Sequence, residues 1–264
     1  MGADVHHSHK PHGNGWTEYL FEFLMVFLAV YFGFLAENIR ERKVEKETAE
    51  ISAKNLYKEL IADSIVIQQM IEVRKIKESE CAYFISYVVD SNLTTLNNRF
   101  YRSFSWAFLQ TGRMLFEPED GILSQLKYSG ELSYFKSAEL QKAIGELSVA
   151  IANVRARNER EYLMVEFYTR PFSIKYFDFA WLNALTRNGQ VEFTDAMIQN
   201  LEVPINGKIP NLDDFDRKEA ENMASYYLLM LRSTRMAQYA KYTSINQRLL
   251  DILRKEYPSS KEPD

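Results

Sequence analysis

The strongest constraint on this chain is an apolar stretch near its N-terminus. Residues 19–36 read YLFEFLMVFLAVYFGFLA and carry one charge, Glu22, before a charged segment begins at Glu37. Eighteen helical residues at about 1.5 Å each span roughly 27 Å, close to the hydrocarbon thickness of a bilayer. The sequence therefore predicts one transmembrane helix over 17–36, ahead of a large water-facing domain.

Two other interpretations suit the uncharged part of this stretch, which also has the length of a signal-peptide core or of a buried helix. A cleavable signal needs a basic segment and small residues before the cut, yet the tail offers only Lys10, and Phe34 lies at the minus-three position of a cut after Ala36. Trp16 and Tyr19 at one end and a basic cluster at the other resemble interfacial anchors. These flanks favour the membrane helix.

The basic residues that follow the stretch bear on which side of the membrane the domain faces. They outnumber the single lysine of the preceding tail, so the positive-inside bias predicts a cytoplasmic domain. A single cysteine, Cys81, excludes an internal disulfide and gives no sign of an oxidising compartment, although it does not exclude the periplasm. The basic residues are Arg40, Arg42, Lys43 and Lys46.

Composition and length set the broad organisation. The net charge is −4 and no dense basic patch occurs, so we expect no nucleic-acid partner. After the membrane helix the remaining length suits one domain with a sizeable core. We expect a His-rich tail over 1–16, the membrane helix over 17–36, a long amphipathic helix over 37–90, a helical bundle domain over 91–258 and a disordered tail over 259–264.

Apolar residues recur at helical spacing through most of the chain, which predicts an all-α fold with about four to six helices in the bundle. No proline occurs between Glu37 and Pro118, so the membrane helix is expected to run on into the long helix. Further helices are expected over 96–111, from Pro118 to Ser129 with Gly130 left-handed after it, from Ser137 to an end at Arg170-Pro171, over 194–201, and from Asp216 to Tyr257, with an irregular region over 171–214.

Three segments occur in an order that resembles a known group of proteins. They are W-x-E-Y-x-F-E-F-L-M-x-F-L-A-V from Trp16, F-x-A-E-N-I-R-E from Phe34 and L-K-Y-S-G-E-L-S-Y-F-K-S-A-E-L from Leu126. With the His-rich head, this order resembles uncharacterised single-span helical membrane proteins of Bacteroidota. The resemblance implies a bacterial inner membrane location, and it implies no activity for any residue.

One face of the predicted membrane helix carries small residues and the only acid. At 100° per residue Glu22, Val26, Ala29, Gly33 and Ala36 fall within about 80° of one another. Small residues four apart let two membrane helices approach closely, and the carboxylate would then face the partner. We call these five residues the packing face. The alternatives are that Glu22 reaches the headgroups, or that it is protonated in a proton-coupled motor or transport-energising subunit.

All histidines of the chain lie in the N-terminal tail. His6, His7, His9 and His12 offer imidazole donors for Zn, Ni or Cu, whereas a solvated polar head that assists insertion is the simpler interpretation. The predicted bundle thus lacks an imidazole base, and no H-E-x-x-H, G-x-S-x-G or phosphate-binding loop occurs. We expect no enzyme activity and no cofactor.

The remaining function classes are those of a non-catalytic membrane protein. We favour a structural or interaction protein, either a homo-oligomer or an accessory subunit of a larger membrane complex, with the bilayer and another membrane helix as partners. The alternative is a helical bundle that senses a ligand and signals through a partner. Aromatic residues between Pro171 and Trp181, beside Arg170 and Lys175, suit a partner contact or a membrane surface.

The apolar stretch yields a direct prediction. The full chain should sediment with membranes, whereas a truncated chain that begins at Lys43 should be soluble and mainly helical by circular dichroism, because the only long apolar block has been removed. A truncated chain that still sediments with membranes, or that shows substantial sheet, would contradict the prediction.

Overall fold

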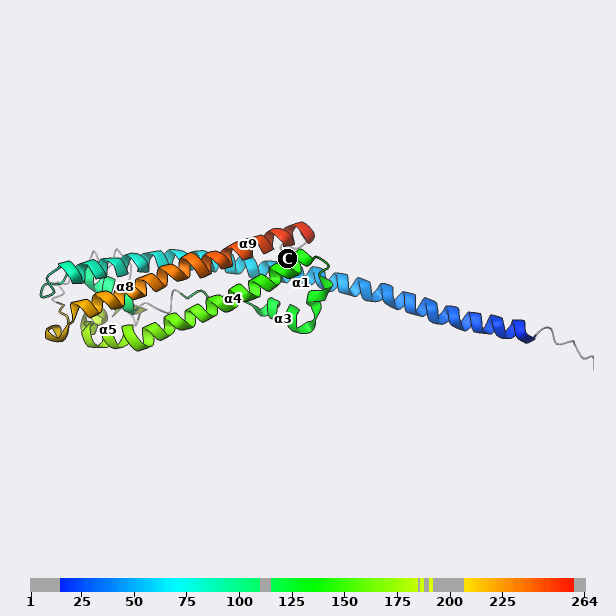
Figure 1. The fold of residues 1–264 in the computed structure, drawn as a ribbon, viewed down its shortest axis with the longest axis horizontal. Helices are drawn as coiled ribbons and strands as arrows, with labels where there is room; N and C mark the ends of the chain where they lie inside the picture. The colour runs from blue at the N-terminus through cyan, green and yellow to red at the C-terminus, as the bar shows by residue number, and fades with distance from the viewer. Residues whose placement is uncertain (1–14, 110–114, 185, 188–189, 192–206, 259–264) are drawn as a thin grey trace, which may run out of the picture.

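The computed structural model describes residues 15–109, 115–184, 186–187, 190–191 and 207–258. One helix, α1 (Gly15–Asp90), runs along the whole molecule and is about 114 Å long at 1.5 Å per residue. Its N-terminal part projects alone, and its C-terminal part packs among the other helices (Figure 1). We call the packed part, which among the described residues runs from Ala49 onward, the helical body.

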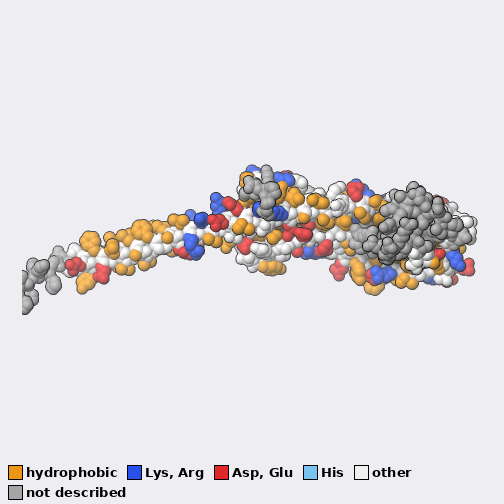
Figure 2. All heavy atoms as spheres, turned by 180° about the vertical axis from the view of Figure 1, so that it is seen from behind, with side chains coloured by type: hydrophobic (Ala, Val, Ile, Leu, Met, Phe, Trp, Pro, Cys, Tyr) orange, Lys and Arg blue, Asp and Glu red, His pale blue; other side chains and the backbone are white. Residues whose placement is uncertain are grey.

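The projecting part of α1 carries the predicted membrane helix. Among the described residues, α1 is the one helix with a stretch long and apolar enough to cross a membrane, and none of that apolar window is buried. The bare apolar side chains are evident along the projecting rod in Figure 2. The first buried residue of α1 is Ala49, so the body begins about thirteen residues after Ala36. The stretch is therefore not the core helix of this body.

The prediction of an all-α fold is confirmed. Within the described residues the strand content is a single antiparallel pair, β1 (Thr186–Arg187) and β2 (Gln190–Val191). The other elements, in chain order, are α2 (Asn98–Phe108), α3 (Gly121–Ser129), η2 (Glu131–Tyr134), α4 (Ala138–Met164), η3 (Val165–Thr169), α5 (Arg170–Tyr176), α6 (Phe179–Ala184), η4 (Leu212–Asp214), α8 (Arg217–Ser233), η5 (Thr234–Tyr239) and α9 (Ala240–Glu256).

Three long helical runs build the body. The run α4–η3–α5 leads away from the projecting helix, and the run α8–η5–α9 returns toward it, lying against α1 and against α4 (Figure 1). Their apolar faces form two cores. The proximal core joins α1 over 49–67 to α3, α4 and α9, and the distal core joins α1 over 81–88 to α2, α5 and α8.

Local capping residues set several helix ends where the sequence predicts them. Gly130 takes φ 80° after α3, a conformation that glycine adopts without a Cβ penalty. The Ser137 side chain accepts from the Leu140 N–H at 3.2 Å at the start of α4. Asp216 accepts from Lys218 N at 2.7 Å and from Glu219 N at 3.1 Å at the start of α8.

One predicted helix end is wrong. The helix does not stop at Arg170-Pro171 but continues through α5 to Tyr176, and α6 follows within the region predicted as irregular. The wider π-helical turn of η3 immediately precedes Pro171, and there the Arg170 N–H bonds back to the Val165 carbonyl. This turn accommodates the proline ring, and burial of Phe172 in the distal core favours the continued helix. The helix predicted over 194–201 lies outside the described residues.

The spacing of the buried residues along α8–η5–α9 explains the π-helix η5. Through α8–η5–α9 the most buried positions are spaced by three or four, except for one step of five between Thr234 and Tyr239. The π-helix η5 covers that step, because a wider turn absorbs one extra residue and keeps the next buried side chain on the same face. These positions are 220, 224, 227, 231, 234, 239, 242, 246, 249 and 253.

If η5 sets the register of the buried side chains, two single-residue deletions should differ in their effect. Deleting Ala237, an exposed residue of η5, should convert the turn to α-helix and keep both buried sets in place, at a cost of about 1 kcal/mol or less. Deleting Ser225 within α8 should instead rotate Tyr227 and Leu231 off the buried face, at a cost of about 3 kcal/mol or more. Denaturant unfolding followed by circular dichroism measures both. Equal losses would show that η5 does not set the register.

Candidate functional site

The packing face lies on the projecting part of α1. Glu22, Val26, Ala29, Gly33 and Ala36 are all exposed, and a Cβ added at Gly33 would meet nothing within 4 Å. The helical body therefore covers none of this face. The side chains are free to contact lipid or another helix, and the predicted packing role stays a prediction.

The other predicted site, the histidine set His6, His7, His9 and His12, lies outside the described residues. Within the described part of the chain, no group of three or more histidine, cysteine, aspartate or glutamate side chains is arranged to hold a metal ion.

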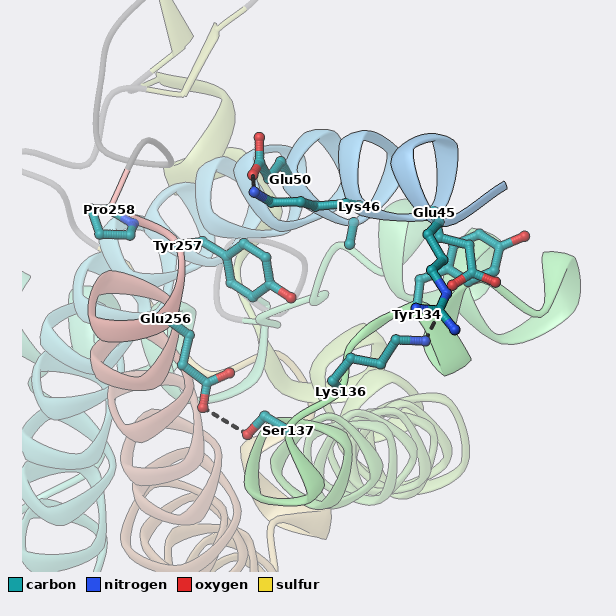
Figure 3. Close-up of a pocket in the computed structure, with 11 residues that line it drawn as sticks. Glu45, Lys46, Glu50, Tyr134, Lys136, Ser137, Glu256, Tyr257 and Pro258 are labelled. Atoms are coloured by element: carbon teal, nitrogen blue, oxygen red, sulfur yellow. Dashed lines mark hydrogen bonds and ion pairs between the residues drawn. The ribbon is translucent and has the colours of Figure 1, made fainter. Parts of the chain in front are cut away.

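A pocket of about 750 Å³ opens at the end of the body that faces the projecting helix. It lies between α1, the start of α4 and the end of α9 (Figure 3). Lys136 pairs with Glu45 at 3.2 Å and Ser137 donates to Glu256 at 2.6 Å across it. We call it the proximal pocket. Its three bases, Arg42, Lys46 and Lys136, are matched by three acids, Glu45, Glu50 and Glu256, so its charge does not select an anion or a cation.

A second groove, of about 920 Å³, lies between the η3–α5 segment and α8. Buried Met164 and Phe172 line it together with exposed Phe167, Tyr168 and Tyr226. We call it the distal groove, because α5 lies at the end of the body away from the projecting helix (Figure 1). About 70 Å of α1 separate this level from the predicted membrane helix, so this aromatic segment does not lie on the membrane that the helix would enter.

A buried charged layer separates the two cores. Arg74 of α1 donates to both carboxylate oxygens of Glu161 of α4, at 3.1 and 2.8 Å, and both side chains are almost fully buried. The Thr234 hydroxyl makes a short hydrogen bond to Glu161, and Arg157 donates to Thr234 at 2.8 Å. The Arg74 guanidinium also lies 4.7 Å from the centre of the Tyr239 ring. One ion pair thus ties together all three long helical runs.

A second base, Lys77, lies about one turn further along α1 than Arg74, and the single cysteine, Cys81, lies about two turns further. Lys77 is fully buried, with its ammonium nitrogen 4.8 Å from the centre of the Tyr227 ring. Burial lowers the pKa of Lys77 to about 7, because the charged form loses water that the protein only partly replaces. Burial raises the pKa of Cys81 to about 12, which keeps it a neutral thiol. Cys81 is therefore a packing residue.

Further ion pairs close the layer toward solvent. Arg235 donates to both oxygens of Glu78, at 2.7 and 2.8 Å. Arg102 pairs with Glu80 at 3.0 Å, and Ser103 donates to the same carboxylate at 2.5 Å. Acids on α1 thus bind bases from α2 and η5, which links the short helix to the long runs.

A third polar contact lies inside the proximal core. Tyr242 of α9 donates a short hydrogen bond to Asp63 of α1, which also accepts from the Glu119 N–H at 3.1 Å. Burial raises the pKa of Asp63 to about 6, although both hydrogen bonds oppose the shift. Asn246 donates to the Leu60 carbonyl at 3.1 Å one turn away. This set fixes α9 against α1.

The chemistry of the layer indicates a structural role. Its charged groups are paired, ring-stacked or closely packed, and no residue of the layer lines the proximal pocket or the distal groove. A reacting molecule would have no path to Lys77 through either space. What the layer does fix is the register and mutual orientation of the helices, because burying these charges in any other alignment would leave them unpaired.

These buried charges are not among the residues predicted above to form a site, although the sequence carries a signal for them. Arg74 occupies a heptad line whose other members are all buried and apolar, namely Ala53, Leu60, Ile67, Cys81 and Val88. Glu161 continues a similar line from Leu140, Leu147 and Val154. A base on one apolar line and an acid on another predict a buried pair.

In comparisons with family models, curated proteins and solved structures, none matches this chain. The resemblance to single-span proteins of Bacteroidota therefore stays a prediction.

The buried pair predicts a non-additive pair of substitutions. Glu161→Gln should lower the free energy of unfolding by about 3–5 kcal/mol, because it leaves the Arg74 charge buried without its counter-charge. The double variant Arg74→Met with Glu161→Met should recover most of that loss, since two apolar side chains need no partner. Denaturant unfolding of the full chain in mild detergent provides the values. Equal stability of Glu161→Gln and wild type would contradict the assigned pairing.

Proposed function

We propose that this chain is a membrane-anchored helical interaction protein, in which residues 17–36 cross a bilayer and the helical body stands in water. The observation that carries the proposal is the bare apolar stretch of α1, which projects from the body and is not covered by it. Contact between water and an apolar helical surface of this length is unfavourable, so lipid or another protein is expected to cover it. We call residues 17–36 the anchor.

The partner contact of the proposal is the packing face of the anchor. Ala29 and Gly33 allow close helix approach, and Glu22 on the same side favours a protein neighbour over lipid. The free space around Gly33 supports this role, because nothing in the body competes for the face. The protein then acts by assembly, as a homo-oligomer or as a subunit of a membrane complex, and no enzyme activity is part of the proposal.

The helical body faces the cytoplasm of a bacterial inner membrane in this proposal. The support is the basic cluster from Arg40 to Lys46, which resists translocation. Exposed Glu37 pairs with Arg40 at 2.9 Å, but acids contribute little to the positive-inside bias. Digestion of the body by protease added outside intact spheroplasts would contradict this orientation.

A second candidate function, ligand sensing, is favoured by one observation, the distal groove. Its volume of about 920 Å³ lies in the range of small-molecule sites, and aromatic rings with a few polar groups line it. A ligand bound there would need a partner to report it, so sensing would also act through assembly.

Substitutions in the anchor test the proposed function. Gly33→Leu should dissociate the assembly, since a leucine between two close backbones pushes them apart, while Tyr31→Leu places the same side chain on the opposite face and should leave the assembly intact. Sizing of the detergent-extracted full chain, with identification of co-purifying proteins, measures both. Unchanged assembly of Gly33→Leu would show that the face is not the contact.

A substitution of the acid separates packing from proton coupling. Glu22→Gln keeps the shape and removes only the ionisable group, so assembly through packing should persist. A variant that assembles normally but abolishes an ion-dependent activity of the associated complex would favour the proton-coupled alternative.

A further inference from the structure

The packing face continues beyond the membrane as an exposed apolar line on the same side of α1. Ile51 lies eighteen residues after Gly33, which is five whole turns, so the two residues point in the same direction on a straight helix. On the same reckoning Val44, Ile65 and Ile76 fall within about 40° of Gly33. We call Val44, Ile51, Ile65 and Ile76 the α1 stripe.

The stripe is uncovered although its residues are apolar. Ile51 is 62% exposed and Ile65 is 57% exposed, whereas their neighbours Ala53 and Ile67 on the opposite side of α1 are buried in the proximal core. Valine and isoleucine repeatedly exposed on one face of a helix indicate a surface that another element covers. From Glu22 to Ile76 the combined face extends over about 80 Å.

The length and position of this face restrict what can cover it. A partner that contacts the whole face must contain a helix that crosses the bilayer and continues straight into water. That helix must also carry exposed apolar residues along one side. α1 itself is such a helix, and two copies inserted with the same orientation are parallel and held at the same depth by the membrane. Confinement to one membrane also raises the effective concentration of one copy near another.

Charged residues interrupt the stripe without opposing a parallel pair. Arg40 pairs with Glu37 of its own chain at 2.9 Å. Exposed Glu47, which falls at the same angle as Ile65, pairs with Lys43 of its own chain at 3.8 Å, so both charges are neutralised locally. Lys58 lies between Ile51 and Ile65 on the same side, and a lysine stem covers apolar surface while its head stays in water. Lys58 is the one basic residue on this side, within about 40° of Gly33, between Val44 and Ile76, and a basic residue at one position of such a seam favours one register at some cost in stability.

We propose that a second copy of this chain packs against α1 in parallel, from the packing face of the anchor through the α1 stripe. The inference rests on the proposed function for its membrane part and adds the identity of the partner. Equivalent residues of the two copies meet across a two-fold axis along the membrane normal. Ile51 therefore contacts Ile51 of the second copy, and Ile65 contacts Ile65.

Cysteine cross-linking of the full chain in native membranes tests the proposal. Ile51→Cys and Ile65→Cys should form disulfide-linked dimers of twice 30.9 kDa on mild oxidation, because bridged cysteines need Cβ atoms about 4 Å apart. The native Cys81 is fully buried and contributes little background. Val149→Cys on α4 is the matched control, since Val149 is 61% exposed but lies on another helix. We expect several-fold more dimer at positions 51 and 65 than at 149.

Other cross-linking patterns would contradict the proposal in whole or in part. Equal cross-linking at 51, 65 and 149 would indicate random collision and overturn the proposal, as would a cross-linked product whose mass shows a different polypeptide. Dimers through Ala29→Cys in the anchor without dimers at 51 or 65 would preserve the proposed function and overturn the inference. Dimers at 51 and 65 that survive Gly33→Leu would instead preserve the stripe contact and count against the anchor contact.

Discussion

The uninterrupted helix α1 is the constraint on which the rest of the structure depends. Its two halves meet different surroundings, because it is largely apolar and exposed up to Ala36 and is buried along one side from Ala49 onward. No glycine or proline occurs between Gly33 and Asp90, so no helix-breaking residue separates the halves. The orientation of the body relative to the anchor is then set by helix geometry, and every core of the body is built on α1.

The buried charged layer determines how the other helices align on α1. Two apolar cores alone would tolerate a slide of one helix past another by a turn, because leucine and isoleucine replace one another readily. A slide of α4 past α1 by one turn would separate Arg74 from Glu161 and break their bidentate contact. Thr234 binds the same carboxylate, so α8–η5 is held in the same register. The layer thus contributes specificity more than net stability, as expected for a buried ion pair with a high desolvation cost.

Those parts of the fold that depend on local chemistry follow from the sequence. The ends of α3, α4 and α8 are set by Gly130, Ser137 and Asp216, whose effect reaches only the adjacent turn. The continuation past Pro171 was missed because it depends on a π-helical turn and on burial of Phe172 by distant helices. Arg74 was missed because its partner lies eighty-seven residues away, although the heptad line places it inside.

The candidate surfaces differ in how far the sequence predicts them. The packing face follows from spacing alone, since a helix with 3.6 residues per turn fixes which residues share a side. The distal groove does not, because η3, α5 and α8 meet there only through the tertiary fold. No residue of α1 lines the distal groove, so a contact made through the outward side of α1 leaves it open. The outward side of α1 and the distal groove are therefore separate surfaces, so a partner on one would not displace a ligand from the other.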